Sequence, residues 1–173
     1  MRFLRLSGYL FAVLLLGVGV ILFVGSRIPA NHTATASGTV AAPRDRVWAL
    51  ISDVSAQPGW RTGLKSVEML PGGSGGPCWR ELQTGMAMPL CVTAADAPNS
   101  RVVAIADPSL PFGGTWTYQL EPDGPASTKV TIREDGVTRP ALWRFIGHYV
   151  LGEDTEVKQY LTDLQRAAPS NPR

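Results

Sequence analysis

The sequence has few of the residues from which metal sites and hydrolytic active sites are usually built. It contains two cysteines and two histidines, and neither histidine lies near the cysteines at the spacing of metal ligands. No Ser-His-Asp or Cys-His arrangement is apparent. The glycine-rich run 72–76 lacks the lysine and the following helix of a phosphate-binding loop. We therefore expect no metal and no cofactor, and the residues leave enzymatic activity uncertain.

Charge is also scarce, at 17% of the chain, and it is unevenly placed. The 21 residues 6–26 carry no charge, whereas Arg2 and Arg5 precede them and Arg27 follows. These three arginines belong to the 16 basic residues, so 13 basic and 14 acidic residues remain, a net charge of −1. That remainder has no basic run and no basic-aromatic patch, which argues against nucleic-acid binding.

The uncharged run has the length of a membrane-spanning helix, which needs about 20 apolar residues to cross a core of ~30 Å. A cleaved signal peptide is the alternative, because Ala34-Thr35-Ala36 resembles a cleavage site. That site lies well beyond the run, and the run exceeds the ~7–15 apolar residues typical of signal peptides. We expect an uncleaved anchor at 1–27. The excess of arginine before the run predicts a cytoplasmic N-terminus, with residues 28–173 on the extracytoplasmic side.

After the anchor we expect a linker at 28–32, one domain at 33–168 and a tail at 169–173. Alternating apolar residues between Pro and Gly clusters predict an antiparallel sheet. A helix should start at Pro43, and a long helical segment should run from Pro140 to about Ala168. The first half of that segment is apolar nearly all round, so it could cap a cavity or lie against the bilayer. The run 71–77 is expected to be a loop. The predicted strands are 33–40, 66–70, 78–83, 86–94, 101–106, 115–120 and 128–134.

The two cysteines fall in a predicted hairpin. A two-residue turn at Thr84-Gly85 places Cys78 directly opposite Cys91, in a pair without mutual backbone hydrogen bonds. Such pairs have Cα atoms about 4.5 Å apart, within the range of a disulfide. We therefore predict a Cys78–Cys91 disulfide; two unlinked thiols would follow from a shift of register by one residue.

The same register sorts the strand residues into two faces, and the face with more large apolar groups should point inward. Two carboxylates, Glu81 and Glu134, share these inward faces. In an apolar cavity either could act as a general acid or base, with Tyr118 nearby. The alternative for each is a position near a strand end, in contact with solvent or an arginine. The predicted ligand-binding set is Trp79, Met86, Met88, Leu90, Trp116, Tyr118, Val130 and Ile132.

Two segments carry a resemblance to a known family. The first is AAPRDRVWALISD at 41–53, followed by Trp60, and the second is PFGGTWTYQL at 111–120, with Glu134 beyond it. Together with the order of elements, they resemble the START-like SRPBCC superfamily, and within it the polyketide cyclase/dehydrase-like proteins. The resemblance implies an α+β helix-grip fold, in which a curved antiparallel sheet wraps around a long C-terminal helix and encloses an apolar cavity. Members bind lipids, sterols, polyketides and hormones, and a minority are enzymes.

Three functions are consistent with these features. The first is a membrane-tethered binding or carrier module for an apolar small molecule or lipid. The second is a cyclase- or dehydratase-type enzyme that uses Glu81 or Glu134. The third is a protein-interaction module whose cavity is filled by its own side chains, with an unknown partner. The anchor and the absence of a catalytic constellation favour the first.

Overall fold

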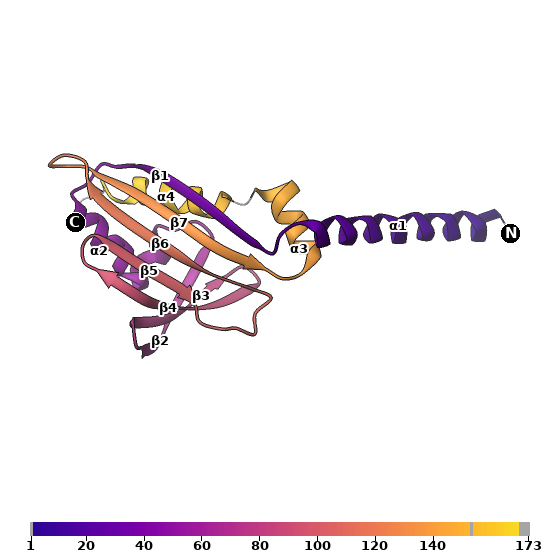
Figure 1. Cartoon of the computed structure of the whole chain (residues 1–173), viewed down its shortest axis with the longest axis horizontal. Helices are drawn as coiled ribbons and strands as arrows, with labels where there is room; N and C mark the ends of the chain where they lie inside the picture. Colours follow the sequence, from indigo (N-terminus) through magenta and orange to yellow (C-terminus); the bar gives the residue numbers. More distant parts are fainter. Residues whose placement is uncertain (1, 153, 170–173) are drawn as a thin grey trace.

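The computed structural model describes residues 2–152 and 154–169, and it shows one helix leading into an α+β domain (Figure 1). Helix α1 (Arg2–Arg27) projects from the domain along the long axis of the molecule. In the domain, helix α4 (Thr155–Ala167) lies along one face of a seven-stranded antiparallel sheet. This is the predicted helix-grip fold. Of the predicted tail at 169–173, the last four residues lie outside the described part of the chain.

The sheet has the strand order β1-β7-β6-β5-β4-β3-β2. Consecutive strands are neighbours from β2 to β7, and β1 completes the sheet beside β7. The first strand begins at Asn31, inside the predicted linker, and stays paired with β7 along its whole length. The bounds are β1 (Asn31–Val40), β2 (Leu64–Gly73), β3 (Gly76–Gln83), β4 (Met86–Asp96), β5 (Ser100–Ile105), β6 (Phe112–Pro122) and β7 (Thr128–Thr138).

The β3–β4 hairpin has the register that its two-residue turn predicts. Gln83 pairs with Met86 next to the turn, and Cys78 pairs with Cys91. The two cysteines form a disulfide with Cα atoms 4.1 Å apart. The run 71–77, expected as a loop, instead extends β2 and β3 to a turn at Ser74-Gly75. Backbone pairing of these strands thus continues into the glycine-rich sequence.

Helices cover the side of the sheet on which the core forms. Helix α2 (Arg44–Ser52) starts directly after Pro43, as predicted, and the 3-10 helix η1 (Val54–Gly59) follows it. The helical segment after Pro140 is divided rather than continuous. It consists of α3 (Ala141–Ile146), the π-helical turn η2 (Gly147–Leu151) and α4. Gly152 has φ +81, a conformation that favours glycine and ends the first part.

The apolar core has two clusters that meet at Trp116 and Tyr118. One cluster joins α2, α4, β1 and β7 and includes Val47, Val130 and Leu164. The other gathers β3, β4 and β5 residues around Trp79, Leu90 and Val103. Trp116 and Tyr118 are only partly buried and pack against both clusters. These two aromatic side chains therefore connect the clusters.

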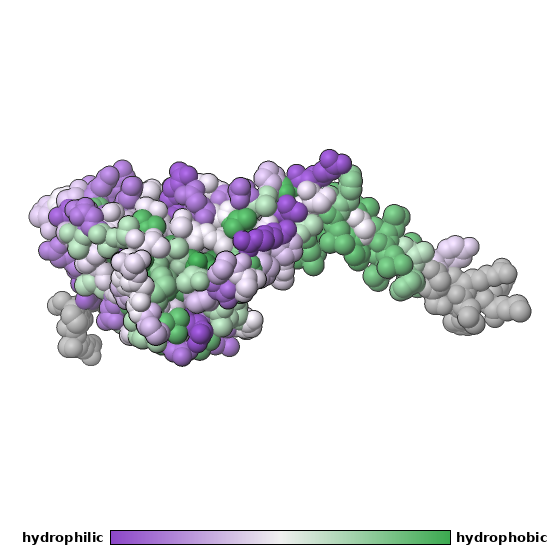
Figure 2. Space-filling model, turned by 60° about the horizontal axis from the view of Figure 1, so that its bottom comes forward, coloured by the Kyte–Doolittle hydropathy of each residue, from purple (hydrophilic) through white to green (hydrophobic). Residues whose placement is uncertain are grey.

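By length and composition, α1 can cross a membrane. Its stretch Tyr9–Arg27 is apolar, and only 6% of that stretch is buried in the structure, unlike a core helix. Figure 2 shows an apolar surface along this helix up to the point where it meets the domain. There α1 packs on α3, so closely at Gly25 that a Cβ would clash with the carbonyl group of Ala141. Arg144 of α3 also donates a hydrogen bond to the carbonyl oxygen of Ile28, at 3.1 Å.

Candidate functional site

An inner cavity of about 230 Å³ lies between the sheet, η1 and α4. Apolar side chains from both core clusters form much of its wall, and charged side chains enter it from β3, β5 and the segment after η1. Six of the eight residues predicted to bind a ligand line this cavity, which places the predicted inward face of the sheet against it. They are Trp79, Met88, Leu90, Trp116, Tyr118 and Ile132.

The other two predicted residues lie elsewhere. Val130 points inward but is fully buried, with 0% exposure, in the cluster beneath α2 and α4, so it does not line a cavity. Met86 lies next to the hairpin turn, is 41% exposed and lines a second, outer cavity. Strand alternation predicts which face a residue occupies. It does not predict which part of that face a helix covers.

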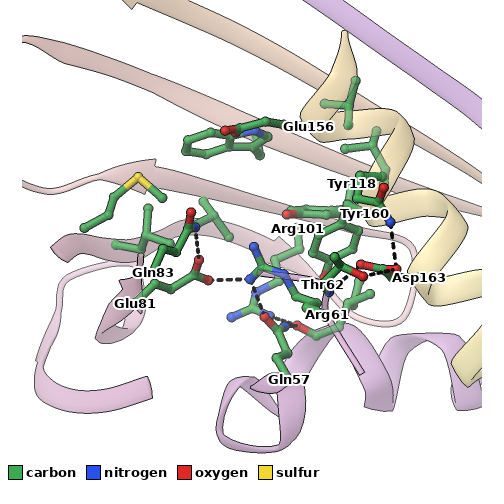
Figure 3. A pocket seen from close by; sticks show the side chains of 18 of the residues that line it. Gln57, Arg61, Thr62, Glu81, Gln83, Arg101, Tyr118, Glu156, Tyr160 and Asp163 are labelled. Carbon is green, nitrogen blue, oxygen red and sulfur yellow. Dashed lines mark hydrogen bonds and ion pairs between the residues drawn. The ribbon is translucent and has the colours of Figure 1, made fainter. Parts of the chain in front are cut away.

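A buried ion pair occupies one wall of the inner cavity. Glu81 on β3 is 1% exposed, and its Oε1 lies 2.5 Å from Nη1 of Arg61, just after η1 (Figure 3). The indole N–H of Trp79 donates to the same oxygen at 3.3 Å, and the amide of Gln83 donates to Oε2 at 3.5 Å. Burial alone would lower the pKa of Arg61, but the nearby charge of Glu81 opposes this effect, and the pKa is raised above its usual value. Glu81 therefore has an arginine partner, and it is buried rather than open to solvent.

The segment that carries Arg61 is fastened to α4. Asp163 accepts hydrogen bonds from the backbone N–H of Thr62 at 2.7 Å and from its hydroxyl at 3.0 Å. Arg166 pairs with this carboxylate from the outer side of the helix. The Arg61 guanidinium also lies over the ring of Tyr160, 4.9 Å from its centroid. These contacts hold Arg61 at a fixed place in the cavity wall.

A second guanidinium, that of Arg101 on β5, enters the same cavity. Its Nη1 donates to the carbonyl oxygen of Ile51, and its Cζ lies 5.2 Å from the ring centroid of Trp79. Burial lowers its pKa, although an arginine stays protonated at physiological pH. Among the described residues, no carboxylate lies within ion-pair distance of Arg101.

Two tyrosines complete the inner cavity. The rings of Tyr118 and Tyr160 have centroids 5.3 Å apart. Burial raises the pKa of both hydroxyls, that of Tyr118 well above its usual value, and the neighbouring tyrosine adds to the effect at Tyr118. Both phenols are therefore protonated at neutral pH and can act as hydrogen-bond donors.

The outer cavity, of about 450 Å³, lies where α1 enters the domain. Ile28, Pro29 and Ala30, which directly follow α1, form part of its wall opposite α3 and η2. The inner and outer cavities share wall residues, so they adjoin each other. The shared residues are Gln83, Met88, Trp116, Thr155 and Glu156.

The second predicted carboxylate, Glu134 on β7, lines the outer cavity. It is 9% exposed, and its Oε1 lies 3.5 Å from Nε2 of His32 on β1. Burial raises the pKa of Glu134, the nearby charge of Glu156 raises it further, and His32 opposes this shift. Of the three predicted catalytic candidates, Glu81 and Tyr118 line the inner cavity, whereas Glu134 lines the outer one. No group of three or more metal-ligating side chains is found in the described part of the chain.

The sequence reasoning missed most of the polar wall. Arg101 had a detectable signal, because it alternates with Val103 and Ile105 along β5 and so shares their face. Arg61, Gln57 and Asp163 had none. Arg61 and Gln57 lie in or after an irregular turn, and Asp163 sits on a helix rich in charged residues.

A family model described as polyketide cyclase/dehydrase and lipid transport matches residues 31–168. A START superfamily protein from Mycobacterium smegmatis is 18% identical, with a TM-score of 0.63, and the match covers 80% of this chain and 97% of that one. The Zhui aromatase/cyclase from Streptomyces sp. R1128 is 16% identical, with a TM-score of 0.64 and coverage of 80% and 94%. A norcoclaurine synthase from Thalictrum flavum is 12% identical, with a TM-score of 0.62 and coverage of 80% and 94%. At these identities the likeness concerns the fold alone. A search of curated proteins found no match.

Proposed function

The chain belongs to the polyketide cyclase/dehydrase and lipid transport family, and from that premise we propose that it is a membrane-tethered binding or carrier module for an apolar small molecule or lipid. The observation that carries the proposal is the pair of adjoining cavities beside α1. One is deep in the domain, and the other is bounded by the residues that follow the helix.

The size of the cavities favours a bound molecule over a filled core. Ligand pockets usually have volumes of about 300–1,000 Å³, and the outer cavity has about 450 Å³. The two cavities argue against the alternative of a protein-interaction module whose cavity is filled by its own side chains.

The position of the outer cavity favours a ligand that arrives from the membrane. Its wall begins at Ile28, one residue after the end of α1, and includes Trp143 of α3. Exposed apolar side chains of α3 and η2, among them Leu142, Tyr149 and Val150, lie next to this region. A molecule leaving the bilayer beside α1 would therefore meet apolar surface up to the cavity.

The strand pairing supports a retained anchor. Ala34 and Ala36, which flank the possible signal-peptide cleavage site, are buried in the middle of β1. Cleavage after Ala36 would remove the six residues that pair with β7 between Val137 and Ile132. We therefore place the domain on the extracytoplasmic side of an uncleaved helix, with the N-terminus in the cytoplasm as the arginine distribution predicts.

A second candidate function is an acid–base enzyme of cyclase or dehydratase type. Glu134 favours it, because the pKa of this buried carboxyl is raised and His32 lies beside it. Glu81 is a poorer candidate, since Arg61, Trp79 and Gln83 occupy its oxygens. If Glu134→Gln abolished substrate turnover and left ligand occupancy unchanged, the result would support this function. If turnover survived the substitution, Glu134 would not be the acid–base residue.

Blocking the junction of the cavities tests the binding function. Met88 is buried and lines both cavities, whereas Met69 on β2 is 51% exposed. We expect Met88→Trp to place an indole in the junction and to reduce severalfold the labelling of domain peptides by a photoactivatable single-chain lipid in nanodiscs. Labelling of α1 in the same sample provides an internal reference, and Met69→Trp is the matched control. Equal domain labelling in the wild type and Met88→Trp would contradict a ligand in these cavities.

A further inference from the structure

Arg101 is a buried cation without a counter-charge. The residue is 4% exposed and lies in the wall of the inner cavity, where its guanidinium donates a hydrogen bond to the neutral carbonyl oxygen of Ile51. Burying a charge without an opposite charge is costly, and buried charges in proteins are normally paired. An arginine cannot relieve this cost by losing its proton.

The acidic groups around the inner cavity are already engaged or lie at its edge. Glu81 is paired with Arg61, and Asp163 is paired with Arg166 and holds Thr62. Glu156 is exposed and lies where the two cavities adjoin. Within the described residues, Arg101 is therefore a guanidinium in the wall of the inner cavity that no carboxylate neutralises.

The two guanidiniums belong to one local hydrogen-bonded unit. Gln57 accepts a hydrogen bond from Arg61 at 2.8 Å and donates one, at 3.2 Å, to the carbonyl oxygen of Ile51 that also binds Arg101. Figure 3 shows Arg61, Arg101, Tyr118 and Tyr160 around the same cavity. Arg61 is already neutralised by Glu81, whereas the positive charge of Arg101 has no such partner and therefore favours a second anion in the cavity.

We propose that the inner cavity binds an anionic head group, a carboxylate or a phosphate monoester, at Arg101, while the apolar part of the same ligand extends into the outer cavity. The planar guanidinium fork matches the oxygens of either anion. The protonated hydroxyls of Tyr118 and Tyr160 are hydrogen-bonded to each other, which leaves one of their two protons to donate to the anion. This inference rests on the proposed function, and it defines the ligand as an amphiphile that enters with its head group first.

The outer cavity is chemically suited to the other end of such a molecule. Its wall near α1 and α3 consists largely of apolar groups, including Ile28, Pro29, Phe112, Val137 and Trp143. The charged groups that do line it are His32, Glu134, Arg144, His148 and Glu156. Glu134, which lines the outer cavity but not the inner one, would repel an anion there, which favours placing the head group in the inner cavity.

Competition between matched single-chain ligands tests the proposal. The full-length chain in nanodiscs would be loaded with equal amounts of palmitic acid and hexadecanol, and native mass spectrometry would give the ratio of the two bound species. A second loading with hexadecyl phosphate and hexadecanol distinguishes the two anions. We expect the preferred anion to exceed the alcohol by about tenfold or more, as the loss of a charge-assisted hydrogen bond implies.

Substitutions assign that preference to Arg101. Arg101→Met keeps an apolar chain against Trp79 and should bring the acid-to-alcohol ratio close to one without loss of alcohol binding. Arg133→Gln is the control, because Arg133 is exposed and pairs only with Asp135 among the described residues. Arg101→Lys keeps the charge and should retain part of the preference. Equal binding of anion and alcohol by the wild type would overturn the head-group site, and this result does not depend on whether Arg101→Met folds. A preference for the anion that survives Arg101→Met would also overturn it. Binding of neither ligand would overturn the proposed function as well.

Discussion

At the scale of single residues, the two candidate carboxylates differ in their contacts. Glu81 and Glu134 both point inward, and the sequence treats them alike. In the structure, Glu81 receives hydrogen bonds from Arg61, Trp79 and Gln83, whereas Glu134 lines the larger cavity beside His32. Glu81 therefore serves to hold Arg61 in place, and Glu134 is the carboxylate with a perturbed pKa that a ligand could reach.

This difference leads to a stability prediction for Glu81. Glu81→Gln preserves the shape of the side chain but leaves the buried Arg61 without a counter-charge. We expect it to lower the free energy of unfolding by about 3–5 kcal/mol. Glu68→Gln breaks the solvent-exposed pair with Arg80 and should cost less than about 1 kcal/mol. Thermal unfolding of both variants, followed by tryptophan fluorescence, compares them. A Glu81→Gln variant as stable as Glu68→Gln would mean that the ion pair is not structural.

At the scale of elements, the predictions were best where local geometry dictates the structure. The turn at Thr84-Gly85 fixes the β3–β4 register, so the pairing of Cys78 with Cys91 could be counted from it. The break between η2 and α4 was missed, although Gly152 and the change from an apolar to a charged sequence both mark it. The periodicity of apolar residues does not reveal a break in a helical segment when the sequences on both sides of the break are helical. The position of α3 against α1 depends on tertiary packing, which a single sequence does not encode locally.

We predict that α1 crosses the membrane with its N-terminus in the cytoplasm. Arg2 and Arg5 precede its apolar stretch, and the Cys78–Cys91 disulfide agrees with an oxidising compartment for the domain. Protease added to the extracytoplasmic side of sealed membranes should degrade the domain and leave an N-terminal tag protected. Detergent, as the control, should make the tag accessible too. Protection of the domain until detergent is added would reverse the proposed orientation.

At the scale of the whole molecule, the order of elements predicted the fold, but the cavities could not be predicted in detail. Alternation placed six of the eight proposed ligand residues in the inner cavity wall. The volume depends on how far α4 approaches the sheet, and the polar wall depends on side chains from η1, β5 and α4 that are distant in sequence. The resulting arrangement is a helix able to span a membrane, an outer cavity at its end and, beyond it, an inner cavity whose wall contains the arginines Arg61 and Arg101.

The measurement that tests this account most directly is native mass spectrometry of the full-length chain, purified from its own host in mild detergent. We predict that a substantial fraction of the protein carries the mass of an apolar ligand, and that Met88→Trp reduces this fraction while Met69→Trp does not. A ligand-free mass for the wild-type chain, together with no uptake of added single-chain lipids, would contradict the binding function.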